Sequence, residues 1–229
     1  LMRIRTDQGR TAEIGRYIEV AMISVDRATA LTHRLLAFSR RQTLDPKPTD
    51  VNRLVSDMEE LFGRTAGPGV EVEIKLASDL WPALCDPNQL ENALQNLVIN
   101  ARDAMPDGGH LLIETANSVF PDWRGVSPGE PPGKVPAGEY MGLFVTDTGT
   151  GMSPDVMARA FDPFFTTKPI GQGTGLGLSM IFGFVQQSGG YVLLSSEAGR
   201  GTMVSIYLPR HFGTAIGREG IDAAGKPTH

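Results

Sequence analysis

Three segments of the chain carry polar side chains or backbone groups in spacings that suit a charged ligand. In the first, Asn96, Asn100 and Asp103 stand at positions i, i+4 and i+7 of an otherwise apolar stretch. This spacing places the three side chains on one face of a helix. Amides on a buried face are costly unless something bonds them, so their oxygens could bind a divalent cation and their N–H groups a phosphate. Ordinary contacts at a helix end explain the same residues, and this segment alone leaves both interpretations open.

The second segment begins with Asp147, which directly follows the apolar residues 140–145, and it continues with Gly149 and Gly151. An ionised carboxylate only accepts hydrogen bonds, so Asp147 suits the exocyclic amine of a base. The two glycines allow backbone and ligand to approach each other closely. A tight turn in which the aspartate bonds its own backbone is equally compatible with these residues.

The third segment has glycines at 171, 173, 175 and 177 and runs directly into an apolar helix expected at 178–185. Exposed N–H groups and the positive end of the helix dipole make such a helix start an anion site. The segment is not a P-loop, because no Gly-Lys-Ser/Thr follows, and it is not a dinucleotide fingerprint, because no strand leads into it. A flexible linker is the alternative, but a linker does not continue straight into an amphipathic helix.

Hydrophobic periodicity and turn residues predict the regular elements that would hold these segments. The helix that carries the first segment begins at Pro87, with Asp86 as its cap, and runs to about Met105. The other expected elements are a helix at 51–62, strands at 70–76, 80–85, 111–116 and 140–146, and a closing hairpin of strands at 191–195 and 203–208. Together they predict an α/β fold with helices on one face and no strict βαβ alternation.

The chain is expected to contain a helical segment at 1–44, a linker at 45–49, a main domain at 50–209 and a disordered tail or linker at 210–229. In the first part, apolar residues recur in steps of four and three, which is typical of a stripe that packs on another helix. We expect the partner helix to come from upstream sequence and a second subunit. A surface helix that folds onto its own domain is the alternative. Pro46 and Pro48 mark the linker.

Length, charge and composition exclude several classes of protein. The chain has 229 residues and a formal net charge of −5, from 21 Lys and Arg against 26 Asp and Glu, which argues against a general nucleic-acid binder. No apolar run approaches the roughly 18 residues that cross a bilayer. The single cysteine, Cys85, excludes an intramolecular disulfide and indicates a reducing, cytoplasmic compartment. Because the chain opens on Leu1 in mid-pattern, we expect it to be a fragment.

In their order along the chain, the three segments, together with Phe161–Lys168 and Gly199–Thr202, resemble the N, G1, F, G2 and final glycine boxes of sensor histidine kinases. That family shares its ATP-binding fold with DNA gyrase, Hsp90 and MutL. The resemblance covers about residues 83–209 and depends on five motifs in the same order. Residues 31–42 resemble the second helix of the dimerisation and phosphotransfer hairpin, especially in hybrid kinases, in which a receiver domain often follows.

The resemblance implies a two-layer α/β sandwich of the Bergerat type, whose mixed sheet holds ATP and Mg²⁺ beneath a mobile lid. By motif, the Asn100 side-chain oxygen would bind Mg²⁺ with assistance from Asn96, and these are the implied catalytic residues. Asp147 would accept the adenine amine, while Gly149 and Gly151 make room for the ring. The other nucleotide-binding residues implied by the resemblance are Arg102, Asp103, Lys168, Gly173, Thr174, Gly175, Leu176, Gly177 and Thr202.

Residues 152–174 would form the lid, with glycines as hinges. Phe161, Phe164 and Phe165 would hold the lid against the core or the helical hairpin; the alternative is that they are plain core aromatics. Lys168 would neutralise the γ-phosphate, or it is a solvated loop lysine.

The residue at position 96 separates a kinase from a hydrolase. Relatives in the gyrase and Hsp90 branch carry a glutamate there to activate water, whereas an amide cannot take up a proton at neutral pH. The resemblance therefore implies a protein-histidine kinase, which transfers the γ-phosphoryl of ATP to a histidine and then to an aspartate of a receiver domain, fused or separate. The family's acceptor histidine precedes an acidic residue, but His33 precedes Arg34. We therefore expect the acceptor upstream of this chain, and no phosphorylation of this chain alone.

Two alternatives stay open at this point. One is a GHKL-type ATPase that couples nucleotide binding to dimer closure, and the other is a nucleotide-sensing scaffold without catalysis. In the kinase interpretation the intact protein is a homodimer.

Overall fold

A computed structural model of the chain describes residues 44–120, 135–169 and 173–213. The chain divides into two compact units, of which one comprises Leu44–Phe165 and Gly175–His229, and the other Leu1–Thr43 and Thr166–Thr174. The α/β fold belongs to the first of these units. The helix expected within residues 1–44, and His33 on it, lie outside the described residues.

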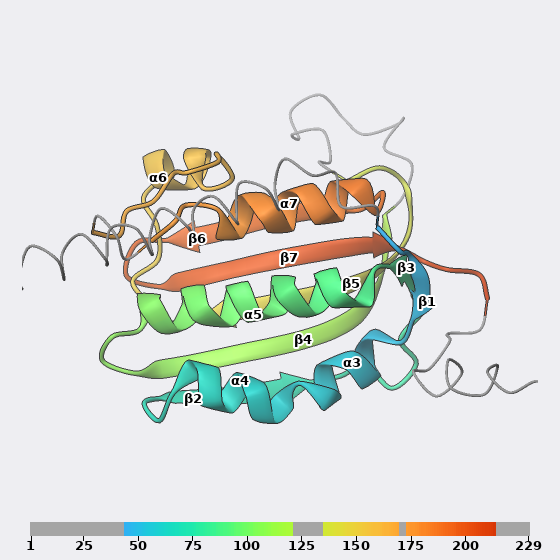
Figure 1. Cartoon of the computed structure of the whole chain (residues 1–229), viewed down its shortest axis with the longest axis horizontal. Coiled ribbons are helices and arrows are strands. Elements are labelled where there is room, and N and C mark those ends of the chain that lie inside the picture. The colour runs from blue at the N-terminus through green and yellow to red at the C-terminus, as the bar shows by residue number, and fades with distance from the viewer. Residues whose placement is uncertain (1–43, 121–134, 170–172, 214–229) are drawn as a thin grey trace, which may run out of the picture. The chain divides into compact units, whose positions relative to one another are not determined.

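The centre of the domain is a five-stranded mixed sheet in the order β2-β4-β5-β7-β6 (Figure 1). Its strands are β2 (Val70–Lys75), β4 (Gly109–Phe120), β5 (Gly138–Asp147), β6 (Tyr191–Glu197) and β7 (Gly201–Pro209). Only β2 and β4 pair in parallel; the remaining neighbours are antiparallel. The register pairs Asp147 with Thr202, so the last residue of β5 lies beside the start of β7, just after the β6–β7 turn. The mixed sheet implied by the sequence resemblance is confirmed.

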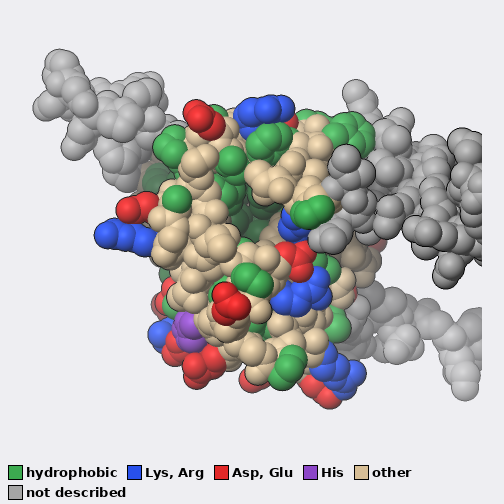
Figure 2. Space-filling view, turned by 90° about the vertical axis from the view of Figure 1, so that its left-hand side faces the viewer, with side chains coloured by type: hydrophobic (Ala, Val, Ile, Leu, Met, Phe, Trp, Pro, Cys, Tyr) green, Lys and Arg blue, Asp and Glu red, His purple; other side chains and the backbone are tan. Residues whose placement is uncertain are grey.

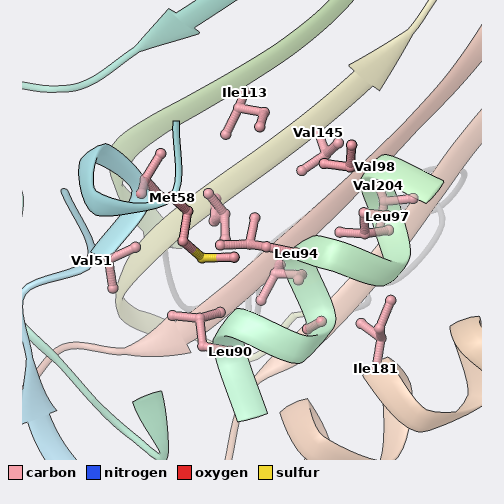
Figure 3. Packing of buried hydrophobic residues seen from close by; sticks show 14 of the residues in the cluster. Val51, Met58, Leu90, Leu94, Leu97, Val98, Ile113, Val145, Ile181 and Val204 are labelled. Carbon is pink, nitrogen blue, oxygen red and sulfur yellow. The ribbon is translucent and has the colours of Figure 1, made fainter. Parts of the chain in front are cut away.

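Helices cover one face of this sheet (Figure 1). They are α3 (Val51–Asp57), α4 (Glu59–Ala66), α5 (Pro87–Ala104) and α7 (Gly177–Gln187), while the short α6 (Pro154–Arg159) precedes α7 in the chain. The expected single helix at 51–62 is wrong in two respects, because it is interrupted and it continues to Ala66. The interruption is at Met58, whose side chain is 6% exposed and turns into the core, as Figure 3 shows.

Helix α5 is held firmly at its start and along one face. The Asp86 carboxylate accepts hydrogen bonds from the N–H groups of Asn88 at 3.0 Å and Gln89 at 3.3 Å, as the sequence predicted. In Figure 3 the apolar face of α5 packs against the sheet and α7, through the buried residues Leu90, Leu94, Leu97, Val98, Ile113, Val145, Ile181 and Val204. Each such side chain stabilises the fold by about 1.5–3 kcal/mol through burial. The polar face of α5 is thereby fixed relative to the ends of the strands.

Residues expected to be a linker take part in the domain. Lys47–Thr49 form strand β1, which pairs with β3 (Ala83–Cys85) in a separate two-stranded sheet. Strand β3 is shorter than the strand expected at 80–85. Before it, the Trp81 backbone N–H bonds a side chain instead of a neighbouring strand: it donates to the Asn117 side-chain oxygen at 2.8 Å. Cys85 is fully buried, and desolvation raises the pKa of its thiol to about 11, which makes it unreactive.

The ordered domain extends past its expected end at residue 209. The Arg210 guanidinium bonds the Glu139 carboxylate at 2.9 Å and stacks over the Trp81 ring at 4.4 Å from its centroid. The Arg210 N–H also donates to the Glu139 carbonyl at 3.0 Å. Arg210, which was expected in a disordered tail or linker, is therefore attached to β5 by ion pairing and to Trp81 by stacking. Residues 214–229 lie outside the described part. Among the described residues, no helix is long and apolar enough to cross a bilayer.

Candidate functional site

The amides of α5 face the beginning of α7. A Cβ atom placed on Gly177 would lie 3.5 Å from Asn100 Nδ2 and 3.7 Å from Asn96 Oδ1. The Asn96 Nδ2 group donates to the Asn92 carbonyl at 2.9 Å, which turns its oxygen toward α7. Gly177 comes 77 residues after Asn100 and 81 residues after Asn96, so two segments that are far apart in the chain lie side by side here. The structure brings together the first and third segments singled out in the sequence.

Asp147 ends strand β5 and is 9% exposed. One of its carboxylate oxygens accepts the Gly149 N–H at 2.9 Å, and the carboxylate also accepts the Thr202 N–H. Burial raises the pKa of Asp147, and these two backbone donors partly oppose the rise. A carboxylate has about four lone-pair positions, so two backbone donors leave accepting capacity for a ligand.

Two glycines fit the Asp147 loop tightly against its neighbours. A Cβ on Gly149 would come within 2.6 Å of the Ala104 carbonyl oxygen, at the end of α5. That same oxygen accepts the Thr150 N–H at 3.0 Å. Gly151 has φ +63°, and a Cβ there would overlap the Glu197 carbonyl oxygen. The loop therefore connects the end of α5 to the β6–β7 turn, with Asp147 between them, and a side chain at either glycine would disturb it.

The first turn of α7 leaves backbone donors available. Its cap residue, Leu176, makes no side-chain capping hydrogen bond and is 1% exposed. Gly175, with φ +63°, lies directly against Phe164 and accepts the Phe164 N–H through its carbonyl at 2.8 Å. N–H groups that are not capped by a side chain at the start of an eleven-residue helix suit an anion, and the Asn96 and Asn100 amides lie beside them.

Figure 2 looks onto the end of the domain at which β5 ends and α7 begins. The surface there is hollowed near its centre, and hydrophobic side chains lie in the hollow. Acidic and basic side chains are scattered around it, without a basic face of the kind that binds nucleic acid.

Arg102 and Asp103 pair with each other. The Arg102 guanidinium donates to the Asp103 carboxylate at 2.7 Å and to the Thr65 carbonyl of α4 at 3.4 Å. Both residues are exposed, and the Arg102 guanidinium reaches α4. Their expected contacts with a nucleotide stay a prediction.

Lys168, Gly173 and Thr174 belong to the other compact unit. Within it, the Lys168 N–H donates to Thr166 Oγ1 at 3.2 Å, and a Cβ on Gly173 would come within 2.5 Å of the same oxygen. The expected roles of these three residues in nucleotide binding stay predictions.

Of the phenylalanines before the third segment, Phe164 is exposed, while Phe161 and Phe165 are partly buried. Phe161 packs on Phe182 of α7 with ring centroids 5.4 Å apart, and Arg159 stacks over Phe165 at 4.3 Å. Phe164 is 46% exposed and has φ +67°, a backbone conformation that is strained for a bulky residue. The described part of this segment is thereby held to α6 and α7.

One polar group beside Asp147, the hydroxyl of Ser196, was not predicted from the sequence. The Ser196 hydroxyl accepts the Met152 N–H at 2.8 Å, donates to the Gly201 carbonyl at 2.9 Å and lies 3.0 Å from Thr202 Oγ1. A serine on a hairpin strand gives no sequence signal of such a role, because serine is common on exposed strand positions.

The donors present at the site fit a magnesium ion carried by a triphosphate. Over the described ranges, no group of three or more His, Cys, Asp or Glu side chains could hold a metal ion alone. Magnesium keeps several waters and takes phosphate oxygens, so it needs only one or two protein ligands, and the Asn100 amide would supply one.

The chain is similar to known proteins in sequence and in fold. Residues 85–211 match the family model described as histidine kinase-, DNA gyrase B- and HSP90-like ATPase. The chain is 43% identical to the sensor kinase CckA of Brucella abortus over 187 residues, which are 82% of this chain and 19% of that protein. It is 28% identical to sporulation kinase E of Bacillus subtilis over 84% of this chain and 24% of that protein. The chain therefore spans about a quarter or less of the curated relatives named here.

A solved structure is similar over nearly the whole chain. The crystal structure of full-length ShkA in complex with AMPPNP superposes with a TM-score of 0.66 and 27% identity, over 90% of this chain and 40% of that one. The family match covers more than half of the 229 residues and includes all three segments. The chain thus belongs to the histidine kinase-, DNA gyrase B- and HSP90-like ATPase family and contains the ATP-binding catalytic domain of a sensor histidine kinase.

Proposed function

We propose that the domain binds ATP with Mg²⁺ in the space between α5, the end of β5 and the beginning of α7. The Asp147 carboxylate accepts the adenine amine, and the triphosphate lies at the uncapped first turn of α7 beside Asn96 and Asn100. The observation that carries the proposal is the approach of both amides to Gly177, with Asp147 on the neighbouring strand end. The AMPPNP in the ShkA complex supports the same ligand chemistry.

The residues of the chain suit phosphoryl transfer better than hydrolysis. Transfer depends mainly on positioning and on neutralising the phosphate charge, which the α7 N–H groups and the two amides supply. When bound, Mg²⁺ would add further neutralisation of the phosphate oxygens. Hydrolysis requires a general base for water, and the Asn96 amide cannot accept a proton at neutral pH. The phosphoryl group therefore goes to an acceptor brought by another part of the protein.

We propose a histidine upstream of this chain as that acceptor, followed by an aspartate of a response-regulator receiver domain. The intact protein would act in the cytoplasm as a homodimer. The similarity to a protein named as a sensor kinase supports a kinase of this type. The GHKL-type ATPase stays the alternative, and steady ATP turnover by the chain alone, without an added acceptor, would favour it.

Asn100→Ala tests the proposal directly. We expect the variant to lose the magnesium dependence of ATP binding, and to transfer phosphate to an added phosphotransfer hairpin at least about 100-fold more slowly, because a ligand to the charge-neutralising ion is removed. Isothermal titration with and without Mg²⁺ and a radiolabel assay measure both effects. Asn88→Ala is the matched control, since Asn88 is exposed at the other end of α5. Wild-type magnesium dependence in Asn100→Ala would contradict the proposal.

The raised pKa of Asp147 predicts a pH dependence of binding. Because the protonated carboxyl no longer presents a full acceptor, ATP affinity should fall as the pH is lowered through this raised pKa. Folding stability should respond in the opposite sense: a group with a raised folded pKa contributes stability below its unfolded pKa, and this contribution is lost as the pH rises through the folded pKa. Titrations of ATP between about pH 4 and 8 measure the first effect. An equal decline in Asp147→Asn would assign the pH dependence to another group.

A further inference from the structure

The Ser196 hydroxyl lies at the junction of the two loops that surround Asp147. It receives the Met152 N–H from the loop that follows β5, and it donates to the Gly201 carbonyl in the β6–β7 turn. It also contacts the hydroxyl of Thr202 at 3.0 Å. One small side chain therefore makes three polar contacts at the position where the two loops meet.

Counting protons fixes the direction of the third contact. A serine hydroxyl has one proton to donate and two lone pairs that accept. The proton goes to Gly201, and Met152 occupies one lone pair, so the remaining lone pair must accept the Thr202 hydroxyl proton. Thr202 Oγ1 is then left only with lone pairs for any other group.

Thr202 is directly connected to the base-recognition carboxylate. It pairs with Asp147 in the strand register, and its N–H donates to the Asp147 carboxylate. Residues that pair directly in antiparallel strands carry their side chains on the same face of the sheet, so the Asp147 carboxylate and Thr202 Oγ1 offer acceptors on one side, without a donor hydroxyl. An amino group on the base can donate hydrogen bonds to these acceptors. A carbonyl oxygen on the base only accepts hydrogen bonds, so it finds no donor side chain here.

We propose that Ser196 is a positioning residue for base recognition, which directs the Thr202 hydroxyl and thereby makes this end of the site selective for a 6-amino purine over a 6-oxo purine. The inference rests on the proposed function, namely that Asp147 binds the base. Ser196 itself need not touch the nucleotide. A purely structural role is the competing explanation, and the bond from the Gly199 N–H to the Thr150 carbonyl at 2.7 Å already connects the same two loops.

Ser196→Ala separates the two explanations when ATP and inosine triphosphate are compared. Without the Ser196 acceptor, the Thr202 hydroxyl can turn and donate to a 6-oxo group. We expect ATP affinity to fall about tenfold, as for the loss of one to two hydrogen bonds, while inosine triphosphate affinity stays equal or rises. Isothermal titration gives the ratio of the two affinities. Ser195→Ala is the matched control, because Ser195 is the exposed neighbour on the same strand, and Ser196→Thr keeps the hydroxyl and should restore most of the ratio.

Each result decides one question. A ratio that falls by about tenfold in Ser196→Ala, with a wild-type ratio in Ser195→Ala, supports the inference. An unchanged ratio, or an equal loss for both nucleotides, overturns it and leaves Ser196 a structural role. Wild-type chain that binds ATP no better than Asp147→Asn overturns the proposed function itself. If Ser196→Ala does not fold, Ser196→Cys is measured in its place, since a thiol keeps the volume but bonds weakly.

Discussion

Asp147→Asn is expected to weaken ATP binding by about 100-fold while the domain stays folded. The loss corresponds to a hydrogen bond that involves a charged acceptor, together with an amide N–H group that can face the adenine amine. Folding should not suffer, because the substitution removes a charge whose burial raises its pKa and costs free energy. We therefore expect a melting temperature equal to or above that of the wild type at neutral pH.

The combination of lost affinity and kept stability is the diagnostic result. Titration calorimetry and thermal unfolding of the same samples measure both quantities. Asp57→Asn is the control, since Asp57 is an exposed aspartate at the end of α3. Wild-type ATP affinity in Asp147→Asn would place the base elsewhere.

Gly201→Ala is expected to have the largest effect on stability, a loss of about 3–5 kcal/mol in the free energy of unfolding. Gly201 has φ +99°, and a Cβ there would overlap the backbone carbonyl oxygen of Asp147. Backbone cannot move aside as the end of a flexible side chain can, so the β5–β7 pairing at Asp147 and Thr202 must open. Urea unfolding measures the loss.

Gly199→Ala isolates the part of this cost that comes from backbone strain. Gly199 has φ +80° in the same turn, but nothing lies within 4 Å of the Cβ position. A loss of about 1–2 kcal/mol is expected there. Equal losses of unfolding free energy in Gly201→Ala and Gly199→Ala would show that the backbone shifts to remove the overlap between the added Cβ and the Asp147 carbonyl. The turn would then not position the Asp147 carboxylate.

Much of this domain was predictable because its local signals agree with its tertiary structure. The Asp86 cap and Pro87 placed the start of α5 correctly, since capping depends on adjacent residues alone. The glycines of the third segment correctly predicted the beginning of α7, and Asp147 was correctly expected at the end of a buried strand. The position of each site segment could therefore be predicted from its neighbouring residues in the sequence.

The features that sequence reasoning missed depend on contacts between residues far apart in the chain. The break at Met58 reflects the position of its side chain in the core, which helical periodicity does not reveal. Arg210 is ordered because it reaches Glu139, 71 residues away. The role of Ser196 arises from Met152, 44 residues away. No short-range pattern contains these pairs.

The most direct test of the account is a crystal structure of the chain with a non-hydrolysable ATP analogue and Mg²⁺. The account predicts the adenine amine within about 2.7–3.2 Å of the Asp147 carboxylate. It also predicts the phosphates at the first turn of α7, beside Asn100. A purine bound away from Asp147, or side chains packed into the space between α5 and the start of α7 with the analogue excluded, would contradict it.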